Sequence, residues 1–477
     1  MLLRAPGVAS ATPDSSRIPS DVQAGPHPRE PLRLEVTDAQ GASNGGQLQD
    51  VASGSQHGAP NRAMTIVYLT NQFPPNIWGG MGIFVHFLTD QLGRNNRLRV
   101  YTTNPGGLAA TEEHGNVKIF RPGRAFLQPF MRRKKSNGHY TWFANLVKIV
   151  DLLFNNIDAF LLLRKHVRSE RPDLIVVHDF MHSLAGLLCK LFLDVPIVFH
   201  VHFVEFTMTP SGRLKDPLGI IRFFESTLAR VARNVIVGTR EMKQLMVRNG
   251  WTAEKIAVVP LCNVNDDSHL IDPSDPRLQA RAREIRRELG IGEDEKMIVY
   301  AGRLVHLKGV FNLIPATRLL ADRIGKVKLV LVGEGNQQKL ESLIRSLGLE
   351  EHVHLYNRFL SREEVLCHYL AAEVCVFPSF QEPFGLVALE AMSLGRPIIL
   401  GTGFSRIFEG RPDRPNVLYV DPRSPEEIAD RAATLLENPR WAAAMGRRAR
   451  HYIQENFSRE KVIALTLDTY RQAAKAC

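Results

Sequence analysis

The sequence is poor in cysteine, and its cysteines form no recognisable motif. The five cysteines are scattered along the chain without a Cys-x-x-Cys pair, at Cys189, Cys262, Cys367, Cys375 and Cys477. This pattern argues against a structural zinc site, a thiol redox motif and the disulfide framework of an exported domain. A reducing compartment, the cytoplasm, fits the cysteine content best.

Hydrophobic runs long enough to span a membrane are also lacking. The most apolar stretch, residues 141–163, is interrupted by Lys148, Asp151 and Asp158 and by three asparagines. A spanning helix needs about 20 mostly apolar residues, so the stretch predicts an amphipathic helix instead. The apolar run at the start of the chain is too short for a secretory signal, and we expect no cleaved targeting segment.

The composition is otherwise that of an ordinary globular chain. Hydrophobic residues make up 44% and charged residues 23% of the 477 residues, which excludes collagen-like, wholly disordered and disulfide-scaffold proteins. The length predicts two or three domains. Because 60 Lys and Arg outnumber 49 Asp and Glu, the net charge is +11, which favours nucleotides, phospholipid surfaces or nucleic acid as partners.

Strands and amphipathic helices alternate from residue 64 onwards. The strands expected from short β-branched runs are at 65–69, 98–101, 174–177, 197–201, 234–237 and 256–259, and then at 297–300, 328–332, 353–356, 374–377, 397–400 and 417–420. This alternation predicts an α/β protein with two doubly wound parallel sheets, each covered by helices on both faces.

The domain boundaries follow from the same pattern. Residues 1–63 are rich in small and polar residues and predict a disordered tail, with Met64 as an alternative start of the chain. We expect a first Rossmann-like domain over 64–265, an interdomain linker over 266–296, a second Rossmann-like domain over 297–457 and a final helix over 458–477. Ligands of such sheets bind at the carboxyl ends of the strands, in a crevice between the domains.

Two helix starts in the second domain carry capping boxes. Ser361 precedes Glu364 by three residues, and Ser424 precedes Glu427 in the same way, with Pro425 at the first helical position. Helices are therefore expected to begin directly after these serines.

A glycine-rich turn follows the first strand. Gly79, Gly80 and Gly82 precede an amphipathic helix, where backbone N–H groups can approach a phosphate or hydroxyl group. A dinucleotide-binding turn is disfavoured, because Val85 replaces the third glycine of the motif and residues 98–104 provide no acid for a ribose. A packing turn without a ligand is the remaining alternative.

Two glutamates, Glu382 and Glu390, lie eight residues apart around an expected helix start near Gly385. The N–H groups of the first turn and the helix dipole suit a diphosphate, and the two acids suit ribose and sugar hydroxyls. The backbone groups expected at the diphosphate belong to Phe384, Gly385, Leu386 and Val387. A solvated helix acid with an unrelated turn acid is the bland alternative.

Two cations, Arg303 and Lys308, lie in the loop after the first strand of the second domain. Facing a diphosphate, they would neutralise the leaving charge that a metal ion otherwise neutralises. The chain has no Asp-x-Asp triplet to hold a divalent ion, so metal-independent chemistry is expected. Two solvated surface charges are the default alternative.

These motifs together resemble the retaining glycosyltransferases of family four, which have the GT-B fold. The resemblance covers about residues 64–474 and rests on Glu382 and Glu390, on the Arg303 and Lys308 loop and on the Gly79-Gly80 turn. It implies that Arg303 and Lys308 bind the donor diphosphate, that Glu390 binds the ribose and that Glu382 faces the transferred sugar. It also makes the first domain the acceptor side and the second the nucleotide-sugar side.

Other positions match the family less strictly. Gly333, Glu334, Tyr356 and Leu360 resemble residues that line the nucleotide pocket. His202 resembles a histidine that reaches the donor sugar, although alone it would be taken as a core histidine. The pair His178 and Asp179 matches a His-Asp pair on the acceptor side of the same cleft.

Two departures from the family are present. The Gly-Gly pair and the Glu expected after the strand that follows the acidic motif are replaced by the run 401–406, in a loop that the resemblance places at the nucleotide and acceptor side. The usual Gly-His before the second strand is replaced by Asn96-Arg97, which we attribute to structural drift.

A basic and aromatic segment precedes the amphipathic stretch. Its members are Arg121, Arg124, Arg132, Arg133, Lys134, Lys135, Phe126, Phe130, Tyr140, Trp142 and Phe143. Such a segment favours peripheral docking of residues 121–163 on an anionic membrane, with a solvated basic loop over a core helix as the alternative.

The sequence therefore predicts a retaining, metal-independent glycosyltransferase without a cofactor. It would move a hexose-type sugar from a nucleotide-diphosphate sugar, UDP favoured and GDP next, to a saccharide or lipid-linked acceptor in glycan or glycolipid biosynthesis. A sugar-nucleotide epimerase or hydrolase on the same fold is one alternative. A basic nucleic-acid-binding protein is another, although no nucleic-acid motif is present.

Overall fold

The computed structural model describes residues 62–77, 79–104, 106–122, 142–203, 218–262 and 272–475. The tail expected over 1–63 lies outside the described residues except at its last two positions. So does most of the basic segment that precedes residue 142.

The first sheet has eight strands in the order β3-β4-β2-β1-β5-β6-β7-β8. Its strands are β1 (Thr65–Leu69), β2 (Arg97–Tyr101), β3 (Thr111–His114), β4 (Val117–Phe120), β5 (Leu174–His178), β6 (Ile197–Val201), β7 (Asn234–Val237) and β8 (Ile256–Val258). All neighbouring pairs are parallel except β3 and β4, which are antiparallel.

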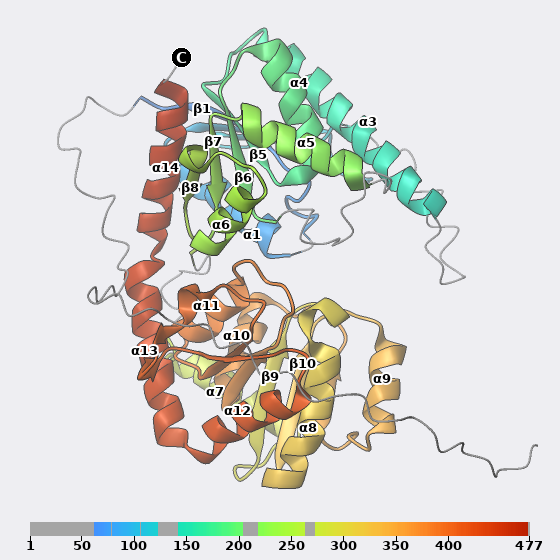
Figure 1. Ribbon diagram of the computed structural model, residues 1–477, viewed down its shortest axis with the longest axis vertical. Helices are drawn as coiled ribbons and strands as arrows, with labels where there is room; N and C mark the ends of the chain where they lie inside the picture. The colour runs from blue at the N-terminus through green and yellow to red at the C-terminus, as the bar shows by residue number, and fades with distance from the viewer. Residues whose placement is uncertain are drawn as a thin grey trace, which may run out of the picture. The chain divides into compact units, whose positions relative to one another are not determined.

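Alternate residues of the central strand β1 enter two separate cores, one on each face of the sheet. Val67 and Leu69 belong to one hydrophobic cluster, and Ile66 and Tyr68 belong to the other. The first face is covered by α3 (Trp142–Val167), α4 (Ser183–Leu193), α5 (Leu218–Val231) and α6 (Arg240–Arg248), and the second by α1 (Gly80–Gly93) and α14 (Arg459–Lys475) (Figure 1). The expected cover on both faces is confirmed.

The sequence did not predict β3 and β4. The strand β3 reads Thr-Glu-Glu-His and lies at the sheet edge, mostly exposed, so it lacks an apolar pattern. The two strands are joined at Gly115 and Asn116, with Gly115 at φ 57°, and such a pair is a hairpin signal. The edge strand is therefore antiparallel within an otherwise parallel sheet.

The second sheet has six strands, all parallel, in the order β11-β10-β9-β12-β13-β16. Its strands are β9 (Lys296–Ala301), β10 (Val327–Val332), β11 (Val353–Tyr356), β12 (Val374–Phe377), β13 (Ile398–Gly401) and β16 (Leu418–Val420). Every predicted strand is present, and its ends differ from those predicted by at most one residue.

The helices of this part are α7 (Pro276–Glu288), α8 (Val310–Ile324), α9 (Gln337–Ser346), α10 (Arg362–Ala371), α11 (Leu386–Ser393), α12 (Pro425–Glu437) and α13 (Pro439–Asn456). Short 3₁₀ turns are η1 (Phe180–His182), η3 (Ala253–Lys255), η4 (His306–Lys308) and η5 (Arg406–Phe408), and β14 (Gly410–Arg411) pairs with β15 (Arg414–Pro415).

Both predicted capping serines are confirmed. The Ser361 Oγ accepts a hydrogen bond from the Glu364 N–H at 3.2 Å, and the Ser424 Oγ accepts one from the Glu427 N–H at 3.1 Å. The helices α10 and α12 begin directly after these residues.

The helix α7 was expected in an interdomain linker, but it packs into the second core. Leu278 and Ile285 on its inner side are buried in that core, and Arg281 forms an ion pair with Glu364 of α10. The apolar residues of α7 recur at helical spacing and form one buried face. This face packs into the core of the second domain, so α7 is part of that domain and not of a linker. The remaining domain limits stay predictions.

The final helix α14 packs against the first sheet although it follows the second. Val462, Tyr470 and Ala473 belong to the same cluster as Tyr68 of β1. The hydroxyl groups of Tyr68 and Tyr470 lie 3.3 Å apart in a buried hydrogen bond. The predicted return of the last helix to the first domain is therefore present.

None of the helices within the described residues combines the length and the apolar character needed to cross a membrane.

Replacement of Tyr470 by alanine tests the packing of α14. Tyr470→Ala removes a fully buried ring and should lower the free energy of unfolding by about 3 to 5 kcal/mol. Urea denaturation followed by fluorescence measures the change. The exposed neighbour Gln472 is the control, because Gln472→Ala should stay within about 0.5 kcal/mol of the original protein. Equal stability of the two variants would contradict the packing described.

Candidate functional site

The loops at the carboxyl ends of the second sheet touch one another through glycines. A Cβ at Gly309, where φ is 74°, would lie 1.9 Å from the Pro378 carbonyl oxygen. A Cβ at Gly333, where φ is 142°, would lie 1.9 Å from the Gly302 carbonyl oxygen. Only glycine fits these positions, so the loops after β9, β10 and β12 form one closely packed surface.

Lys308 and Glu382 meet on this surface. Lys308 ends η4 after β9, and Glu382 lies in the loop after β12, where its N–H donates to the Gly403 carbonyl at 2.9 Å. The two side chains form an ion pair and are 17% and 21% exposed. The lysine therefore lies beside the acid that the sequence assigned to the sugar.

Arg303 lies in the same loop as Lys308 and is exposed. Among the described residues its guanidinium has no hydrogen bond or ion pair, while its backbone carbonyl accepts a hydrogen bond from the Tyr300 hydroxyl at 2.9 Å. The loop thus presents one paired cation and one that remains available to an anion.

Glu390 is buried on α11 and forms an ion pair with Arg362 of α10. Burial raises the pKa of Glu390, and Arg362 opposes this rise. The sequence predicted Glu390 but missed Arg362, because residue 362 follows the capping serine and looks like an ordinary first-turn residue. Arg362 therefore stabilises the charged form of a carboxyl group that burial destabilises.

The N-terminus of α11 lies against that of α1. Gly385 precedes α11 with φ 91°, and a Cβ there would lie 2.3 Å from the Phe404 ring. A Cβ at Gly80, the first residue of α1, would lie 3.0 Å from the Leu386 side chain. Two helix N-termini, with their partial positive charge, therefore approach each other.

The neighbouring glycines and Phe384 have different surroundings. Gly79 precedes α1 in an extended conformation, and a Cβ at Gly82 would contact Gln72 and Ile77. The ring of Phe384 is buried against Phe408 and Phe457, so its side chain serves the core and only its backbone remains for the predicted role.

The loops after β10 and β11 are joined by backbone contacts. The Gly333 N–H donates to the Tyr356 carbonyl at 3.0 Å, and the Gly335 N–H donates to the Asn357 Oδ1 at 2.9 Å. Glu334 is exposed, and Leu360 packs partly buried against the core. These predicted nucleotide-pocket positions are therefore close together, at the same end of the sheet as Lys308.

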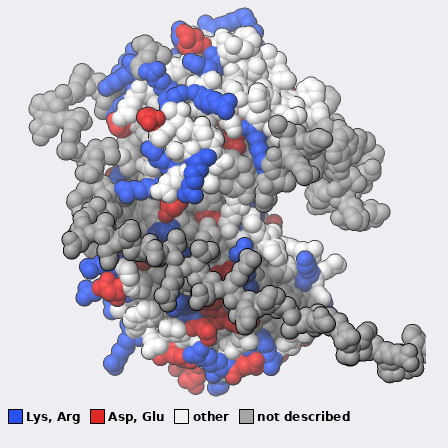
Figure 2. Space-filling view, in the orientation of Figure 1, with Lys and Arg blue, Asp and Glu red and all other residues white. Residues whose placement is uncertain are grey.

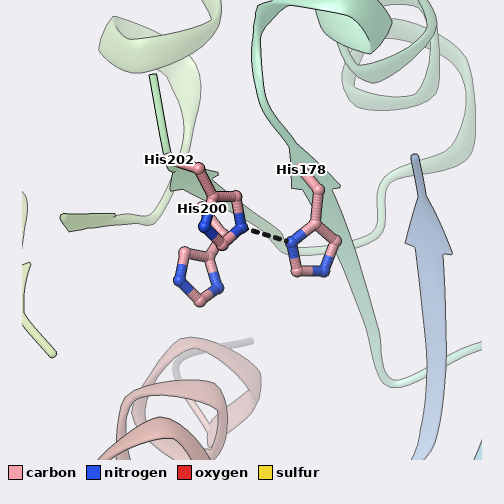
Figure 3. A group of neighbouring side chains, drawn as sticks. All are labelled: His178, His200 and His202. Carbon is pink, nitrogen blue, oxygen red and sulfur yellow. Dashed lines mark hydrogen bonds between the residues drawn. The ribbon is translucent and has the colours of Figure 1, made fainter. Parts of the chain in front are cut away.

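Three histidines lie together at the carboxyl ends of β5 and β6 (Figure 3). His178 ends β5 and lies in register with His200 of β6, and His202 follows two residues later on the same face. The sequence missed His200, although its two-residue spacing from His202 at the end of an expected strand was a usable signal. The His178 Nδ1 and the His202 Nε2 are hydrogen-bonded at 3.1 Å.

These histidines are held neutral by burial. Burial lowers the pKa of His202 to about 3 and lowers the pKa values of His178 and His200 well below their usual range. One nitrogen from each ring lies within 4.8 Å of the others, which suits a metal ion. The His178 Nδ1 and the His202 Nε2 are also hydrogen-bonded to each other, and the two rings are within 16° of parallel.

Asp179 shapes the turn that holds His202. Its φ is 61°, and its Oδ1 accepts hydrogen bonds from the N–H groups of His202 and Phe203 at 2.8 and 2.9 Å. Burial raises the pKa of Asp179 to about 7, and the two N–H groups oppose the rise. The acid is therefore used, at least in part, to position the neighbouring strand end.

The unusual loop after β13 is fastened by an acid from α6. The Glu241 carboxylate accepts from the Ser405 Oγ at 2.9 Å and from the Arg406 N–H at 3.1 Å. Glu241 was not predicted, because only the fold brings the first turn of α6 to this loop. Thus the segment that departs from the family pattern is ordered by a long-range contact.

One part of the basic docking segment is excluded by its surroundings. Arg121 is buried and forms an ion pair with Glu112 at 3.0 Å, and it donates to the Pro74 carbonyl at 3.0 Å. Its charge is therefore satisfied inside the first domain, which corrects its assignment to a docking surface. Residues 123–141, with the other cations of this segment, lie outside the described residues.

A separate cavity of about 300 Å³ lies at the opposite, amino ends of β6 and β7. Lys190, Asp194 and Lys255 line it, and none of the predicted site residues does.

Comparison with known families assigns both halves of the chain. Residues 79–262 match the family described as "Glycosyl transferase 4-like domain", and residues 281–452 match "Glycosyl transferases group 1". The second match includes the Arg303 and Lys308 loop and both glutamates of the acidic motif.

The similarity to known relatives extends over most of the chain. It is 27% identical over 425 residues to a D-inositol 3-phosphate glycosyltransferase of Kineococcus radiotolerans, covering 83% of this chain and 91% of that protein. The structure is similar to sucrose-phosphate synthase from Thermosynechococcus elongatus, with a TM-score of 0.69 and 21% identity over 87% of this chain and all of that one. The structure is also similar to HepE from Anabaena in complex with UDP-glucose, with a TM-score of 0.64 and 19% identity, covering 86% of this chain and all of HepE. These structures show the GT-B fold.

Removal of Arg362 should make stability depend on pH. In Arg362→Met the pKa of Glu390 should rise further, because its nearest opposite charge is lost. At pH 8 the variant buries an unpaired carboxylate and should lose about 3 to 5 kcal/mol. Near pH 5, where Glu390 can take up a proton, the loss should be smaller.

Urea denaturation at both pH values measures this difference. Arg358→Met, at an exposed arginine of the preceding loop, is the control and should show no such dependence. The double variant Arg362→Met/Glu390→Gln should also lose it. A loss in Arg362→Met that is equal at both pH values would contradict the role given to the pair.

Proposed function

We propose a donor, site residues and an acceptor for this chain, which belongs to the group 1 glycosyl transferases of family four. The chain is a nucleotide-sugar-dependent glycosyltransferase. We propose that it transfers a hexose-type sugar with retention of the anomeric configuration. UDP-sugars are the favoured donors and GDP-sugars the next.

The observation that carries the proposal is the position of Lys308 at the loop that leads into α11. Lys308 is adjacent to the loop that leads into this helix, and Arg303 extends from the same loop as Lys308. Both cations and the N–H groups of residues 384–387 would bind the donor diphosphate. Charge on the leaving diphosphate grows during transfer, so these groups act more strongly on the transition state than on the bound donor.

The two glutamates would bind opposite ends of the donor, Glu390 the ribose and Glu382 the sugar. Glu390 lies five residues into the helix from Gly385 and would accept the ribose hydroxyl groups. Glu382 would face the hydroxyl groups of the sugar, with Lys308 holding its carboxylate in place. The glycine turns at 79–82 and 333 and the loop from Tyr356 to Leu360 would complete the nucleotide pocket. The UDP-glucose bound by HepE supports a uridine donor.

The histidine group would face the sugar and the acceptor. His202 is neutral at pH 7, so its ring can donate or accept a hydrogen bond to a sugar hydroxyl without carrying charge. His178 fixes the His202 ring through its hydrogen bond, and Asp179 holds the backbone of the same turn. With no evident nucleophile, retention suits a path in which the leaving diphosphate helps to deprotonate the acceptor.

The acceptor is proposed to be a saccharide or a lipid-linked molecule in glycan or glycolipid biosynthesis. The reaction would take place in the cytoplasm, with the enzyme peripheral to the membrane. Because Arg303 and Lys308 supply the positive charge at the diphosphate, we propose that no metal ion is required.

Replacement of Lys308 tests the diphosphate site. Lys308→Ala should lower kcat by about two to three orders of magnitude, the range seen when one preorganised transition-state contact is removed. Steady-state release of the nucleoside diphosphate measures it, with circular dichroism to confirm folding. The control is Lys326→Ala, since Lys326 is exposed and precedes β10 at the other end of the sheet. Unchanged turnover in Lys308→Ala would refute the assignment.

Chelation tests the proposed independence from metals. EDTA should leave the initial rate within about twofold of the untreated rate, since protein cations carry out the charge neutralisation. The rate is measured after dialysis against EDTA and again after addition of Mn²⁺ or Mg²⁺. Loss of activity with EDTA and recovery with either ion would contradict the proposal.

A further inference from the structure

Exposed hydrophobic side chains are concentrated on three helices that cover one face of the first sheet. Among the described residues, twelve large hydrophobic side chains are exposed, and eight of them lie on α3, α4 and α5. These eight are Phe154, Ile157, Leu161, Leu191, Phe192, Ile220, Phe223 and Val231, with exposures from 37% to 73%. Single exposed hydrophobic residues are normal, but such a concentration marks an interaction surface.

The Phe192 ring touches Phe160, with ring centroids 5.7 Å apart, but the core of the domain does not account for the exposed area of these residues. Each of the three helices has a second, inward face that supplies the core, through Phe160 and Leu163 on α3, Cys189 on α4 and Leu228 on α5. A surface helix with its apolar side already buried is expected to be polar on the outside. The outward apolar residues are therefore in excess of what folding needs.

On α3 the exposed residues form one stripe. Phe154, Ile157 and Leu161 are spaced by three and four residues, which places them on the same face of the helix. Arg164 and Arg168 continue this spacing and are also exposed. Asp158 is also exposed and lies on this face, because it follows Phe154 by four residues and precedes Leu161 by three. The stripe is thus mostly apolar over two turns and basic at its end, an arrangement in which cations can reach lipid phosphates while apolar side chains enter the bilayer.

The helices pack side by side, and their exposed charges are mostly positive. Figure 1 shows α3, α4 and α5 next to one another, and in Figure 2 the upper right of the molecule, over these helices, is largely uncharged. Within the three helices four exposed residues are basic, Arg164, Lys165, Lys190 and Arg230, whereas the one exposed acid among their described residues is Asp158. No described residue forms an ion pair with Arg164 or Lys165.

An apolar surface bordered mostly by basic residues matches an anionic bilayer, because the negative surface potential of the bilayer attracts Lys and Arg side chains.

We propose that the outward face of α3, α4 and α5, called here the α3–α5 face, docks on an anionic lipid bilayer. Phe154, Phe192 and Phe223 enter the interface, one from each helix, and the basic residues contact the lipid phosphates. The inference deepens the proposed function, since it supplies the surface that would bring the enzyme to a lipid-linked acceptor. It corrects the sequence prediction by adding α4 and α5 and by removing Arg121.

Vesicle flotation of the full chain tests the α3–α5 face. The probes are vesicles of phosphatidylglycerol and phosphatidylcholine, and vesicles of phosphatidylcholine alone. The protein should float with the anionic vesicles, bind the neutral vesicles at least tenfold more weakly and be released by 0.5 M salt. The variant Phe154→Gln/Phe192→Gln/Phe223→Gln should bind anionic vesicles at least tenfold more weakly.

A matched control separates this face from general hydrophobicity. Val247→Gln/Leu319→Gln/Trp441→Gln changes three large hydrophobic residues of 37% to 40% exposure on other helices, and it should float like the original protein. Both triple variants alter exposed side chains and should keep the original melting temperature within a few degrees. Equal flotation of the α3–α5 variant and the original protein, or no flotation of the original protein, would overturn the proposal.

Two further measurements distinguish other occupants and other failures. If a second copy covered this face, light scattering would show a dimer that the α3–α5 variant converts to a monomer, which would overturn the bilayer proposal. UDP binding by calorimetry should be equal in the original protein and in the variant. Flotation without binding of any nucleoside diphosphate would leave the α3–α5 face in place and refute the proposed function instead.

Discussion

Backbone contacts between glycine-containing loops hold the candidate site together. At the carboxyl end of the second sheet Gly309 lies against Pro378 and Gly333 lies against Gly302, in each case too close for any side chain. These contacts bring the loop with Arg303 and Lys308 to the loop with Glu382 and then to the start of α11. A larger residue at either glycine would separate loops that carry the charges of the site.

The charges of the site are satisfied in pairs, and the arrangement leaves one cation available. Glu382 pairs with Lys308, and the buried Glu390 pairs with Arg362. Arg303 is exposed and has no such partner among the described residues. On the first domain, by contrast, burial keeps His178, His200 and His202 neutral. Under the proposed function, the cations would face phosphate and the neutral histidines would face uncharged hydroxyl groups.

Much of this could be predicted from the sequence, and the exceptions have physical causes. Buried parallel strands appear as short β-branched runs, so all twelve predicted strands were found within one residue of their limits. The edge strands β3 and β4 lack that pattern, because β3 is charged and exposed. The helix α7 was recognised but placed in a linker, since its buried face becomes evident only against the second core.

The candidate site divides in the same way. Residues that belong to a local motif, such as Lys308 with Arg303 or Glu382 with Glu390, could be found from spacing. Arg362 and Glu241 could not, since each acts on a partner far along the chain that only the fold brings near. Only part of the α3–α5 face could be predicted from the sequence. The stripe on α3 has a helical period, but the fold alone places α4 and α5 beside it.

The most direct test of the central claim is a thermal-shift panel with UDP, GDP, ADP and NAD on the chain from Met64 onwards. A nucleoside diphosphate at about 100 times its Kd should stabilise the protein by about 2.7 kcal/mol, a rise of several degrees in Tm. The account predicts this rise for one nucleoside diphosphate, UDP first, and its loss in Glu390→Ala. Silence from all three diphosphates, or a response to NAD alone, would contradict it.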